Sequence, residues 1–260
     1  MFEAMLKKAS LFKRIIESTK DLLGDISIDF LDSGISFKAV DSSHISLVSV
    51  FIDIKSFETF KYERDIKIDI NISSLNKIFT RAKDDDTLTL RLLNPNLDSI
   101  CIEFQSSNNS RKNNYELKLL DIDQESLTIP EQEYSVMISM ASDEFKRICQ
   151  NLMVIGELVT IVANQNENMI KFKSDNDNGD VCSIELQEKD SNNTNEQVTI
   201  SIGSSINVSF GLKYLLSFSK ASILSQRVSI CLEINMPILV KYEIEENYIH
   251  YYLAPKFKED

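Results

Sequence analysis

Most of the chain alternates apolar and polar residues with a period of two, which is the pattern of a half-buried β-strand. Many strands of this kind, joined by short polar turns, indicate antiparallel sheets. We therefore predict an α+β protein in which antiparallel sheets predominate. The clearest predicted strands are residues 26–30, 66–72, 88–92, 198–202 and 228–232.

Four segments instead space their apolar residues as an amphipathic helix does. In the first segment, Ser10 is expected to cap the start of the helix and Gly24 to follow its end. In the third segment, Ser142 is expected to cap the helix, and Asp143 and Glu144 lie in its first turn, where negative charge is favourable. The predicted helices are residues 10–23, 73–83, 142–152 and 211–221.

The helical segments indicate an internal duplication. Phe12-Lys13-Arg14-Ile15 recurs as Phe145-Lys146-Arg147-Ile148, and each copy opens a helix that alternating strands follow. The second helix of each half also matches, at one constant offset. We expect two similar domains with a connector between them, at residues 1–118, 119–134 and 135–260.

The expected connector is acidic. Residues 119–133 include five acidic residues and no basic one, and Pro130 would interrupt strand pairing. We therefore expect an exposed loop here. Two further loops are expected at residues 175–180 and in the Asn-rich stretch 191–196.

The net charge of −12 argues by itself against a protein that coats nucleic acid indiscriminately, because duplex phosphates would repel it. The predicted helices nevertheless hold ten basic residues against four acidic ones. Lysines on solvated helices are the ordinary explanation. A surface that faces DNA phosphates is the alternative that we favour, because all four helices would present a basic face. The ten residues are Lys13, Arg14, Lys20, Lys77, Arg81, Lys83, Lys146, Arg147, Lys213 and Lys220.

Phosphate contacts of this kind would not depend on base sequence and would weaken with salt, so they would permit sliding. None of the predicted helices carries the cluster of Arg, Asn and Gln that reads base edges. We therefore do not expect sequence-specific DNA binding.

The sequence carries no signature of catalysis. Its only histidines are His44 and His250, and it has no phosphate-binding glycine loop, GxSxG elbow or HExxH helix. Asp84-Asp85-Asp86 could bind a divalent cation, but a solvated turn is the ordinary explanation. The stretch from Asp41 to His44 suggests a Ser/His/Asp triad only superficially, because residues this close on one loop rarely converge. We predict no catalytic residue, metal or cofactor, and no enzymatic activity.

The four cysteines form no CxxC pair, which argues against zinc and against a disulfide framework, so we expect buried reduced thiols. No apolar run approaches the roughly 20 residues that cross a membrane. The first residues do not follow the pattern of a secretory signal, so we expect the protein to stay inside the cell. The cysteines are Cys101, Cys149, Cys182 and Cys231.

Five stretches are specific enough to indicate a family. They are Met1-Phe2-Glu3-Ala4, Val40-Asp41-Ser42-Ser43-His44-Ile45-Ser46-Leu47-Val48, Ile129-Pro130-Glu131-Gln132-Glu133-Tyr134-Ser135, Phe145-Lys146-Arg147-Ile148-Cys149 and Tyr251-Tyr252-Leu253-Ala254-Pro255-Lys256. Over essentially its whole length, the chain resembles the eukaryotic DNA sliding clamps, the proliferating cell nuclear antigen family.

The resemblance implies two similar sliding-clamp domains per subunit, with antiparallel sheets outside and four helices lining the hole of a ring. It implies a homotrimer that encircles duplex DNA in the nucleus, as a processivity factor for replicative DNA polymerase and a docking platform for replication and repair proteins. The implied partners are duplex DNA, DNA polymerase, clamp loader, flap nuclease, ligase and other proteins with a clamp-binding peptide. No membrane is implied.

The resemblance also implies where subunits meet, in strands near residues 111–117 and 180–186. These strands would otherwise be unpaired edges, which need a partner or protection. The implied interface residues are Arg111, Tyr115, Leu117, Val181 and Ile184.

An apolar pocket for partner peptides is expected beneath the connector. Leu127, Ile129 and Pro130 lie in an otherwise acidic stretch, so their side chains need an apolar surface. Such a pocket suits peptides of the type Gln-x-x-Leu/Ile/Met-x-x-Phe/Tyr-Phe/Tyr, whose helical turn projects one aliphatic and two aromatic anchors. The ordinary alternative is that these residues only close a domain boundary. By resemblance, the other walls are Val40, His44, Ile45, Leu47, Pro237, Tyr252, Ala254 and Pro255.

The nearest alternative is a subunit of the heterotrimeric checkpoint clamp, which shares the fold. The intact connector and Leu253-Ala254-Pro255 favour the replication clamp. A sequence-specific DNA-binding protein and a carboxylate-dependent hydrolase are the alternatives from other classes.

The sequence departs from the family pattern at several positions. The family's best-known modified lysine falls in residues 164–168, which contain no lysine, so regulation through that site is in doubt. Gln150 stands at a basic position of the third helix, and Thr80 replaces another in the second. The tail, residues 257–260, is shorter and less acidic than the family pattern.

Overall fold

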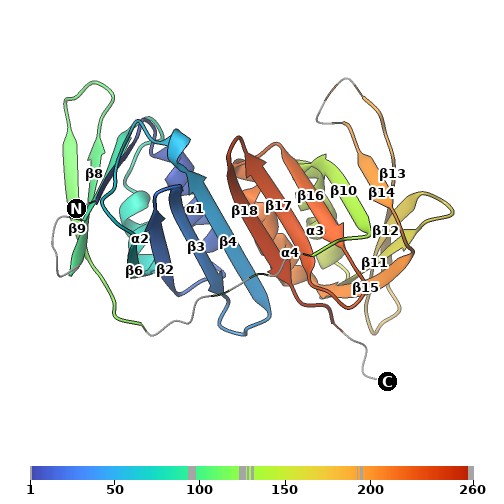
Figure 1. Cartoon of the computed structure of the whole chain (residues 1–260). Coiled ribbons are helices and arrows are strands. Elements are labelled where there is room, and N and C mark those ends of the chain that lie inside the picture. Colours follow the sequence, from blue (N-terminus) through green and yellow to red (C-terminus); the bar gives the residue numbers. More distant parts are fainter. Residues whose placement is uncertain are drawn as a thin grey trace. The chain divides into compact units, whose positions relative to one another are not determined.

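The structure is a computed structural model that describes residues 2–92, 98–122, 127, 129, 132–191, 193 and 196–256. The chain divides into two compact units. The first unit is Met1–Ser43, Val48–Thr128 and Ile244–Ile249, and the second is His44–Leu47, Ile129–Glu243 and His250–Asp260. In Figure 1 most of the first unit runs from blue to green, and most of the second from yellow-green to red.

The first nine strands form two groups of neighbouring strands, and the first two α-helices lie between them in the sequence. The elements are β1 (Phe2–Leu6), α1 (Ser10–Thr19), β2 (Asp25–Leu31), β3 (Gly34–Val40), β4 (Ser46–Asp53), a 3₁₀ helix (Ile54–Ser56), β5 (Thr59–Lys61), β6 (Ile66–Asn71), α2 (Ile72–Phe79), β7 (Thr87–Leu92), β8 (Ser99–Gln105) and β9 (Lys112–Lys118). Strands β5, β1, β7, β8 and β9 are neighbours in that order. Strands β4, β3, β2 and β6 are neighbours in the second group.

The remaining elements form two further groups. They are β10 (Val136–Ala141), α3 (Ser142–Met153), β11 (Leu158–Asn164), β12 (Met169–Asp175), β13 (Val181–Gln187), β14 (Thr199–Ile202), β15 (Ile206–Gly211), α4 (Leu212–Phe218), a 3₁₀ helix (Ser219–Ile223), β16 (Arg227–Leu232), β17 (Ile238–Ile244) and β18 (Asn247–Leu253). Strands β14, β10, β16, β17 and β18 are neighbours in one group, and β13, β12, β11 and β15 in the other.

The two sets of strands share one topology. The order of the second set is the order of the first with every strand number raised by nine. The helices agree, since α1 and α3 each follow the first strand of a set and α2 and α4 each follow the sixth. The pairs that form, such as β1 with β7 and β10 with β16, are antiparallel. The predicted duplication and the predicted class, antiparallel sheets with four helices, are confirmed.

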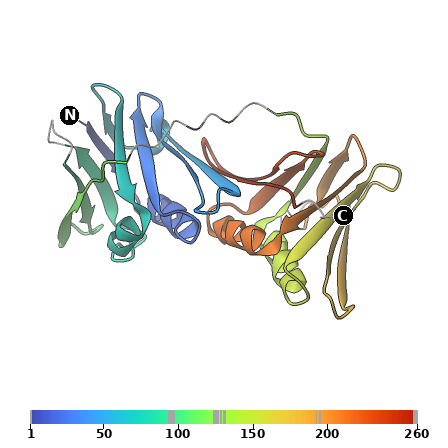
Figure 2. The same cartoon turned by 90° about the horizontal axis from the view of Figure 1, so that it is seen from below.

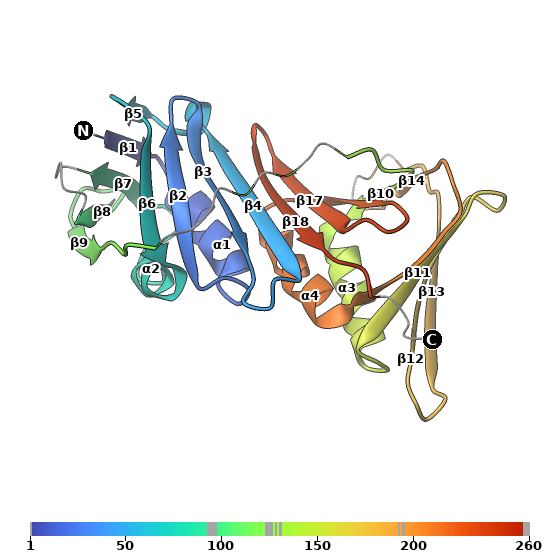
Figure 3. The ribbon, with the colours of Figure 1, turned by 60° about the horizontal axis from the view of Figure 1, so that its bottom comes forward.

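In each unit the two helices contact each other and lie on one side of the strands (Figure 2 and Figure 3). Phe12 of α1 stacks on Phe79 of α2 with ring centroids 5.2 Å apart, and Phe79 meets Phe104 of β8 edge-on at 5.3 Å. In the second unit, Phe218 of α4 stacks on Tyr251 of β18 at 4.6 Å. Rings of this size bury a large apolar area, so they fix the helices on the sheets.

None of the helices in the described residues has the length and apolar character that crossing a bilayer requires.

The predicted capping residues of two helices are wrong. Helix α1 begins at Ser10, but its N-cap is Ala9, which makes no side-chain capping hydrogen bond. Helix α3 begins at Ser142, and its N-cap is Ala141. An N-cap residue lies just before the helical backbone, whereas both serines already lie within it. The acidic first turn predicted for α3 is confirmed.

Helix α1 is also shorter than its apolar spacing predicts, because it ends at Thr19 instead of residue 23. The hydroxyl groups of Ser18 and Thr19 donate to the carbonyl oxygen of Ile15 at 2.8 and 3.0 Å. These bonds satisfy a carbonyl at the helix end and compete with further helical hydrogen bonds. Helices α2 and α4 are also shorter than predicted, because the chain continues as turns after α2 and as a 3₁₀ helix after α4.

A chain of alternating charges crosses the whole five-stranded sheet. Lys61 of β5 contacts Glu3 of β1 at 2.8 Å, and Glu3 contacts Arg91 of β7 at 2.6 Å. Arg91 contacts Glu103 of β8 at 2.8 Å, and Glu103 contacts Lys112 of β9 at 2.9 Å. The Glu103 side chain is only 7% exposed, so its charge depends on these partners. Below, we call these five residues the charged ladder.

The cysteines are all free thiols. Cys149 and Cys231 are buried, and burial raises the pKa of Cys149 to about 12, so this thiol stays protonated. Cys101 and Cys182 are only half-buried, and the prediction of burial is wrong for them. Cys101 lies next to the edge of its sheet, on β8, and Cys182 lies on the edge strand β13, where less chain covers them.

Candidate nucleic-acid and peptide interfaces

The ten basic residues lie in the four helices or in the turns and the 3₁₀ helix that follow them. The exposed ones are Lys77, Arg81, Lys83, Arg147, Lys213 and Lys220. The half-buried ones are Arg14, Lys20, Lys146 and Lys13, whose side chain is only 18% exposed. Helices α2, α3 and α4 therefore present exposed basic side chains, whereas those of α1 are partly covered.

Lys13 and Arg14 of α1 are held by the turn that follows α2. Lys13 Nζ donates to the carbonyl oxygen of Ala82 at 3.0 Å and to Asp84 Oδ1 at 3.2 Å. Arg14 Nη2 donates to Asp84 Oδ2 at 3.3 Å. One carboxylate thus bonds both cations, and hydrogen bonds from Lys13 and Arg14 hold the pKa of Asp84 below its ordinary value.

Two exposed cations of the second unit have partners close to them in the chain. Arg147 of α3 pairs with Glu144 of its own helix at 3.3 Å and stays 67% exposed. Lys213 of α4 lies over the ring of Tyr214, with Nζ 4.9 Å from the ring centroid. Both contacts leave the cation at the surface, where such contacts are weak and easily exchanged for a phosphate.

Two long strand edges have no neighbouring strand within the described residues. Strand β9 is an edge of the sheet β5-β1-β7-β8-β9, and β13 is an edge of the sheet β13-β12-β11-β15. The other edges are short or bridged: β5 has three residues and β14 has four, while Leu120 bridges to β6 and Lys256 to β15. Long open edges pair with other chains unless something protects them. The predicted subunit contacts fall on or beside these two strands.

The predicted interface residues lie at these edges in different ways. Tyr115 and Leu117 share the half-buried face of β9, and the Tyr115 ring meets Phe104 edge-on at 6.0 Å. On β13, Val181 is 54% exposed and Ile184 is half-buried. Arg111, just before β9, instead donates to the carboxylate of Asp86 in its own unit at 3.2 Å.

The start of the expected connector is fixed to β6 by Asp69. The backbone N–H of Leu120 donates to the Asp69 carbonyl at 2.8 Å, and that of Ile122 donates to Asp69 Oδ2 at 3.3 Å. Ser27 holds the other carboxylate oxygen through a hydroxyl donor at 2.5 Å. Sequence reasoning missed Asp69, because nothing in the alternation of β6 sets it apart. Much of the connector, including Pro130, lies outside the described residues.

Most residues expected to form the peptide pocket belong to the second unit. The N–H of Ala254 donates to the carbonyl of Ile45 at 3.0 Å, which brings two of the expected segments together. His44 is exposed and has a positive φ of 55°, which turns the chain before Ile45. The half-buried members are Ile45, Leu47, Ile129, Pro237, Tyr252, Ala254 and Pro255. Val40 and Leu127 are half-buried residues of the first unit.

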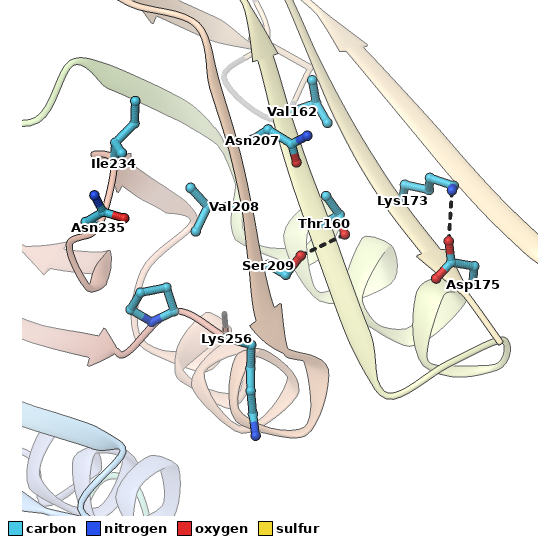
Figure 4. A pocket seen from close by; sticks show the side chains of 11 residues that line it. Thr160, Val162, Lys173, Asp175, Asn207, Val208, Ser209, Ile234, Asn235 and Lys256 are labelled. Atoms are coloured by element: carbon cyan, nitrogen blue, oxygen red, sulfur yellow. Dashed lines mark hydrogen bonds and ion pairs between the residues drawn. The ribbon is translucent and has the colours of Figure 1, made fainter. Parts of the chain in front are cut away.

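Pro255 also borders a cavity of about 440 Å³ in the second unit. Figure 4 shows Thr160 and Ser209 joined by a hydrogen bond of 2.9 Å between neighbouring strands, and Lys173 paired with Asp175 at 2.8 Å. The lining mixes these polar groups with Val162, Val208 and Ile234. The cavity therefore differs from the mainly apolar pocket expected for aromatic anchors.

The acidic run after α2 is not uniform. Asp84 and Asp85 are exposed, as a solvated turn predicts. Asp86 is buried and accepts a hydrogen bond from the Lys83 N–H at 2.9 Å, so the prediction of a solvated turn is wrong for this residue. No group of three or more His, Cys, Asp or Glu side chains within the described residues is placed to hold a metal ion.

Two equivalent sets of antiparallel strands, each carrying a pair of helices, and basic residues gathered on those helices in an acidic chain define the class of DNA sliding clamps. Comparison with known proteins gives the family. The models of the N-terminal and C-terminal domains of proliferating cell nuclear antigen match residues 1–127 and 128–257. The chain belongs to the proliferating cell nuclear antigen family.

A relative from Chaetomium thermophilum, named proliferating cell nuclear antigen, supports this assignment. It is 40% identical over 261 residues, which cover 100% of this chain and 100% of the relative. The family consists of non-enzymatic sliding clamps of DNA replication, so the prediction that the chain is not an enzyme is confirmed. The domain boundaries at residues 118 and 135 stay a prediction.

Proposed function

We propose that this sliding clamp acts as a homotrimeric ring around duplex DNA in the nucleus. In this role it is a processivity factor for replicative DNA polymerase and a docking platform for replication and repair proteins, including clamp loader, flap nuclease and ligase. The observation that carries the proposal is the gathering of basic residues on four helices in a chain of net charge −12. A subunit of the heterotrimeric checkpoint clamp is not favoured, because the two family models together match residues 1–257.

The ring proposal also rests on the two open strand edges. One chain carries both β9 and β13, so a second copy can offer the edge that the first lacks. Pairing of β9 with β13 would bring the half-buried face of β9, with Tyr115 and Leu117, beside the half-buried face of β13, with Ile184, while Val181 would lie on the opposite face. Identical copies suffice for such a closed assembly, which favours a homotrimer over a ring of three different chains.

The proposed DNA contacts are weak and independent of base sequence. The helices would face the hole of the ring, where their lysines and arginines meet phosphates. The acidic remainder of the chain would discourage contact between DNA and the outer surface. The proposed residues are Lys13, Arg14, Lys20, Lys77, Arg81, Lys83, Lys146, Arg147, Lys213 and Lys220.

Charge reversal on the helices tests these contacts. Lys77→Glu combined with Lys213→Glu should weaken binding to duplex DNA, and the salt dependence should lose a slope of about 1 for each phosphate contact removed. Polymerase stimulation on primed DNA should fall as well. The measurements are fluorescence anisotropy with a labelled duplex across a salt series and primer extension.

Lys38→Glu combined with Lys241→Glu is the matched control, because it reverses the same charge on strands β3 and β17. The control should keep DNA binding closer to wild type. If the helix variant stays assembled, binds DNA and stimulates the polymerase as well as the control does, the proposed DNA-facing surface is wrong.

Partner proteins are proposed to dock through short peptides in the apolar pocket. The residues are Val40, His44, Ile45, Leu47, Leu127, Ile129, Pro130, Pro237, Tyr252, Ala254 and Pro255. The support is the contact of Ala254 with Ile45 and the half-buried state of those apolar members that the structure describes, which leaves part of each side chain open to a partner. Aliphatic and aromatic anchors of a bound peptide would supply most of the affinity.

Truncation of the pocket should weaken peptide binding. Leu47→Ala or Ile129→Ala should each cost about 1 to 3 kcal/mol of binding free energy to a Gln-x-x-Leu-x-x-Phe-Phe peptide, measured by calorimetry. Met137→Ala removes an exposed apolar side chain from β10 and serves as the control, which should bind as wild type does. Equal affinity in all four proteins would contradict the pocket.

A further inference from the structure

We infer that Asp84 competes with DNA phosphates for Lys13 and Arg14, and so sets how strongly helix α1 contributes to DNA binding. The inference rests on the proposed function, in which both cations belong to the DNA-facing surface. It goes beyond that function because it assigns Asp84, in the turn after α2, a role that weakens the DNA contacts of Lys13 and Arg14 in α1. The group with which Asp84 competes is the phosphodiester of the DNA backbone.

The geometry gives Asp84 direct control of both cations. Its two oxygens lie 3.2 Å from Lys13 Nζ and 3.3 Å from Arg14 Nη2. Lys13 also donates to the carbonyl of Ala82, and its side chain is only 18% exposed. A phosphate that contacts Lys13 therefore competes with an existing carboxylate bond. Because Asp84 is 53% exposed, its charge also repels an approaching phosphate.

The turn that carries Asp84 is held in place, so the competition does not depend on a mobile side chain alone. Asp86 is buried and bonds the N–H of Lys83 at 2.9 Å and the guanidinium of Arg111 at 3.2 Å. Its carbonyl accepts from the N–H of Ala9, just before α1, at 2.7 Å. The turn and the start of α1 are thus tied together, with Asp84 next to the two cations.

The duplication supplies an internal comparison. Strand β6, helix α2 and strand β7 begin at Ile66, Ile72 and Thr87, and their counterparts β15, α4 and β16 each begin 140 positions later. This offset matches Asp84 with Leu224, which has no carboxylate. In α3, Lys146 and Arg147 repeat the pair of α1, and Arg147 is 67% exposed with a partner only in its own helix. The first pair is therefore held by a separate turn, whereas the partner of Arg147 lies in its own helix. Wild-type DNA binding should depend more on Arg147 than on Arg14.

The test uses the full chain and a labelled linear duplex at low ionic strength, with binding followed by fluorescence anisotropy across a salt series. Asp84→Asn should tighten binding about 3- to 10-fold and steepen the salt dependence, because it frees up to two cations for phosphates. Asp85→Asn is the matched control. It removes the same charge from the same turn, but Asp85 only reaches Lys8, at 3.8 Å. Its effect should stay below about 2-fold, as expected for a weak surface contact.

A second substitution shows whether the gain comes from the freed cations. Adding Arg14→Met to Asp84→Asn should remove much of the gain, so Arg14→Met should cost more DNA binding in the Asp84→Asn protein than in the wild type. Asp84→Ser should reproduce the gain of Asp84→Asn, which guards against an effect particular to one amide.

Two outcomes overturn different claims. If Arg147→Met weakens binding while Asp84→Asn binds no more tightly than Asp85→Asn, Asp84 is not a competitor and the DNA-facing surface still stands. If Arg147→Met and the double variant of Lys77 and Lys213 leave binding unchanged, the DNA-facing surface itself is wrong, and the competition is wrong with it.

Discussion

Replacing Arg91 by alanine should lower the free energy of unfolding by about 2 to 4 kcal/mol, because it leaves the nearly buried carboxylate of Glu103 with only one of its two cationic partners. Arg91 is the centre of the charged ladder and bonds Glu3 at 2.6 Å and Glu103 at 2.8 Å. The loss should exceed that of Lys61→Ala, which removes an exposed end of the ladder, where a pair contributes only about 0 to 1 kcal/mol. Urea denaturation at one fixed protein concentration measures both, since assembly also stabilises the chain.

The pH dependence of the same variants gives a second measurement. Burial would raise the pKa of Glu103, but hydrogen bonds from Lys112 and Arg91 outweigh it and hold the pKa below the ordinary 4.5. A depressed pKa means that the stabilisation is complete above 4.5 and is lost as pH falls through the lower, folded value. Arg91→Ala should therefore flatten the decline in stability below about pH 4.5. A loss under 1 kcal/mol, together with an unchanged acid decline, would contradict the role given to Arg91.

Tyr115→Ala should convert the proposed homotrimer to monomers at micromolar concentration. An aromatic side chain at the centre of an interface commonly contributes about 2 to 4 kcal/mol, and a ring of three repeats the loss at each junction. Tyr115 suits this role because it is half-buried on the open strand β9. Sedimentation equilibrium gives the mass directly.

Two further variants separate association from folding. Tyr115→Phe keeps the aromatic side chain and its contact with Phe104, so this variant should remain a trimer. Tyr62→Ala removes an aromatic residue from the segment between β5 and β6 and should leave the mass unchanged. A trimer that persists in Tyr115→Ala would remove this residue from the interface. A wild-type chain that sediments only as monomer would end the homotrimer proposal.

Strands were predictable where one face is buried and the other is open. Strand β6 alternates buried and less buried residues along its whole length, so the period of two in the sequence is the period of its burial. Strand β4 differs, because Val48, Ser49 and Val50 are all buried in succession. Both faces of this strand are covered at that point, and alternation could not identify it.

Contacts between distant residues were not predictable from local patterns. Lys13 lies beside the apolar stripe of its helix, which predicts that its side chain points away from the core. In the structure this side chain bonds Asp84, a residue 71 positions later in the chain. Spacing on a helix defines the direction of a side chain but not which other element meets it. The anchoring of the connector by Asp69 escaped prediction for the same reason.

The candidate sites came from two kinds of inference. Counting charges over the predicted helices found the basic residues without any knowledge of the family. The interface residues and most pocket residues came from the resemblance, because an apolar residue such as Leu47 is indistinguishable from a core residue in a strand pattern. Its half-buried state is a property of packing between segments far apart in sequence, which period alone does not encode.

The two open edges belong to strands that are not equivalent under the internal duplication, since β9 corresponds to β18 and β13 to β4. Copies joined through β9 and β13 therefore associate head to tail. An open chain of such copies, whatever its length, leaves β9 unpaired at one end and β13 unpaired at the other. Breaking a single junction of the proposed ring would therefore open it without disturbing the other junctions. The β9 and β13 edges exposed by that break are complementary to each other. The opened ring can therefore close again, by pairing the same two strands, around a molecule that has entered it.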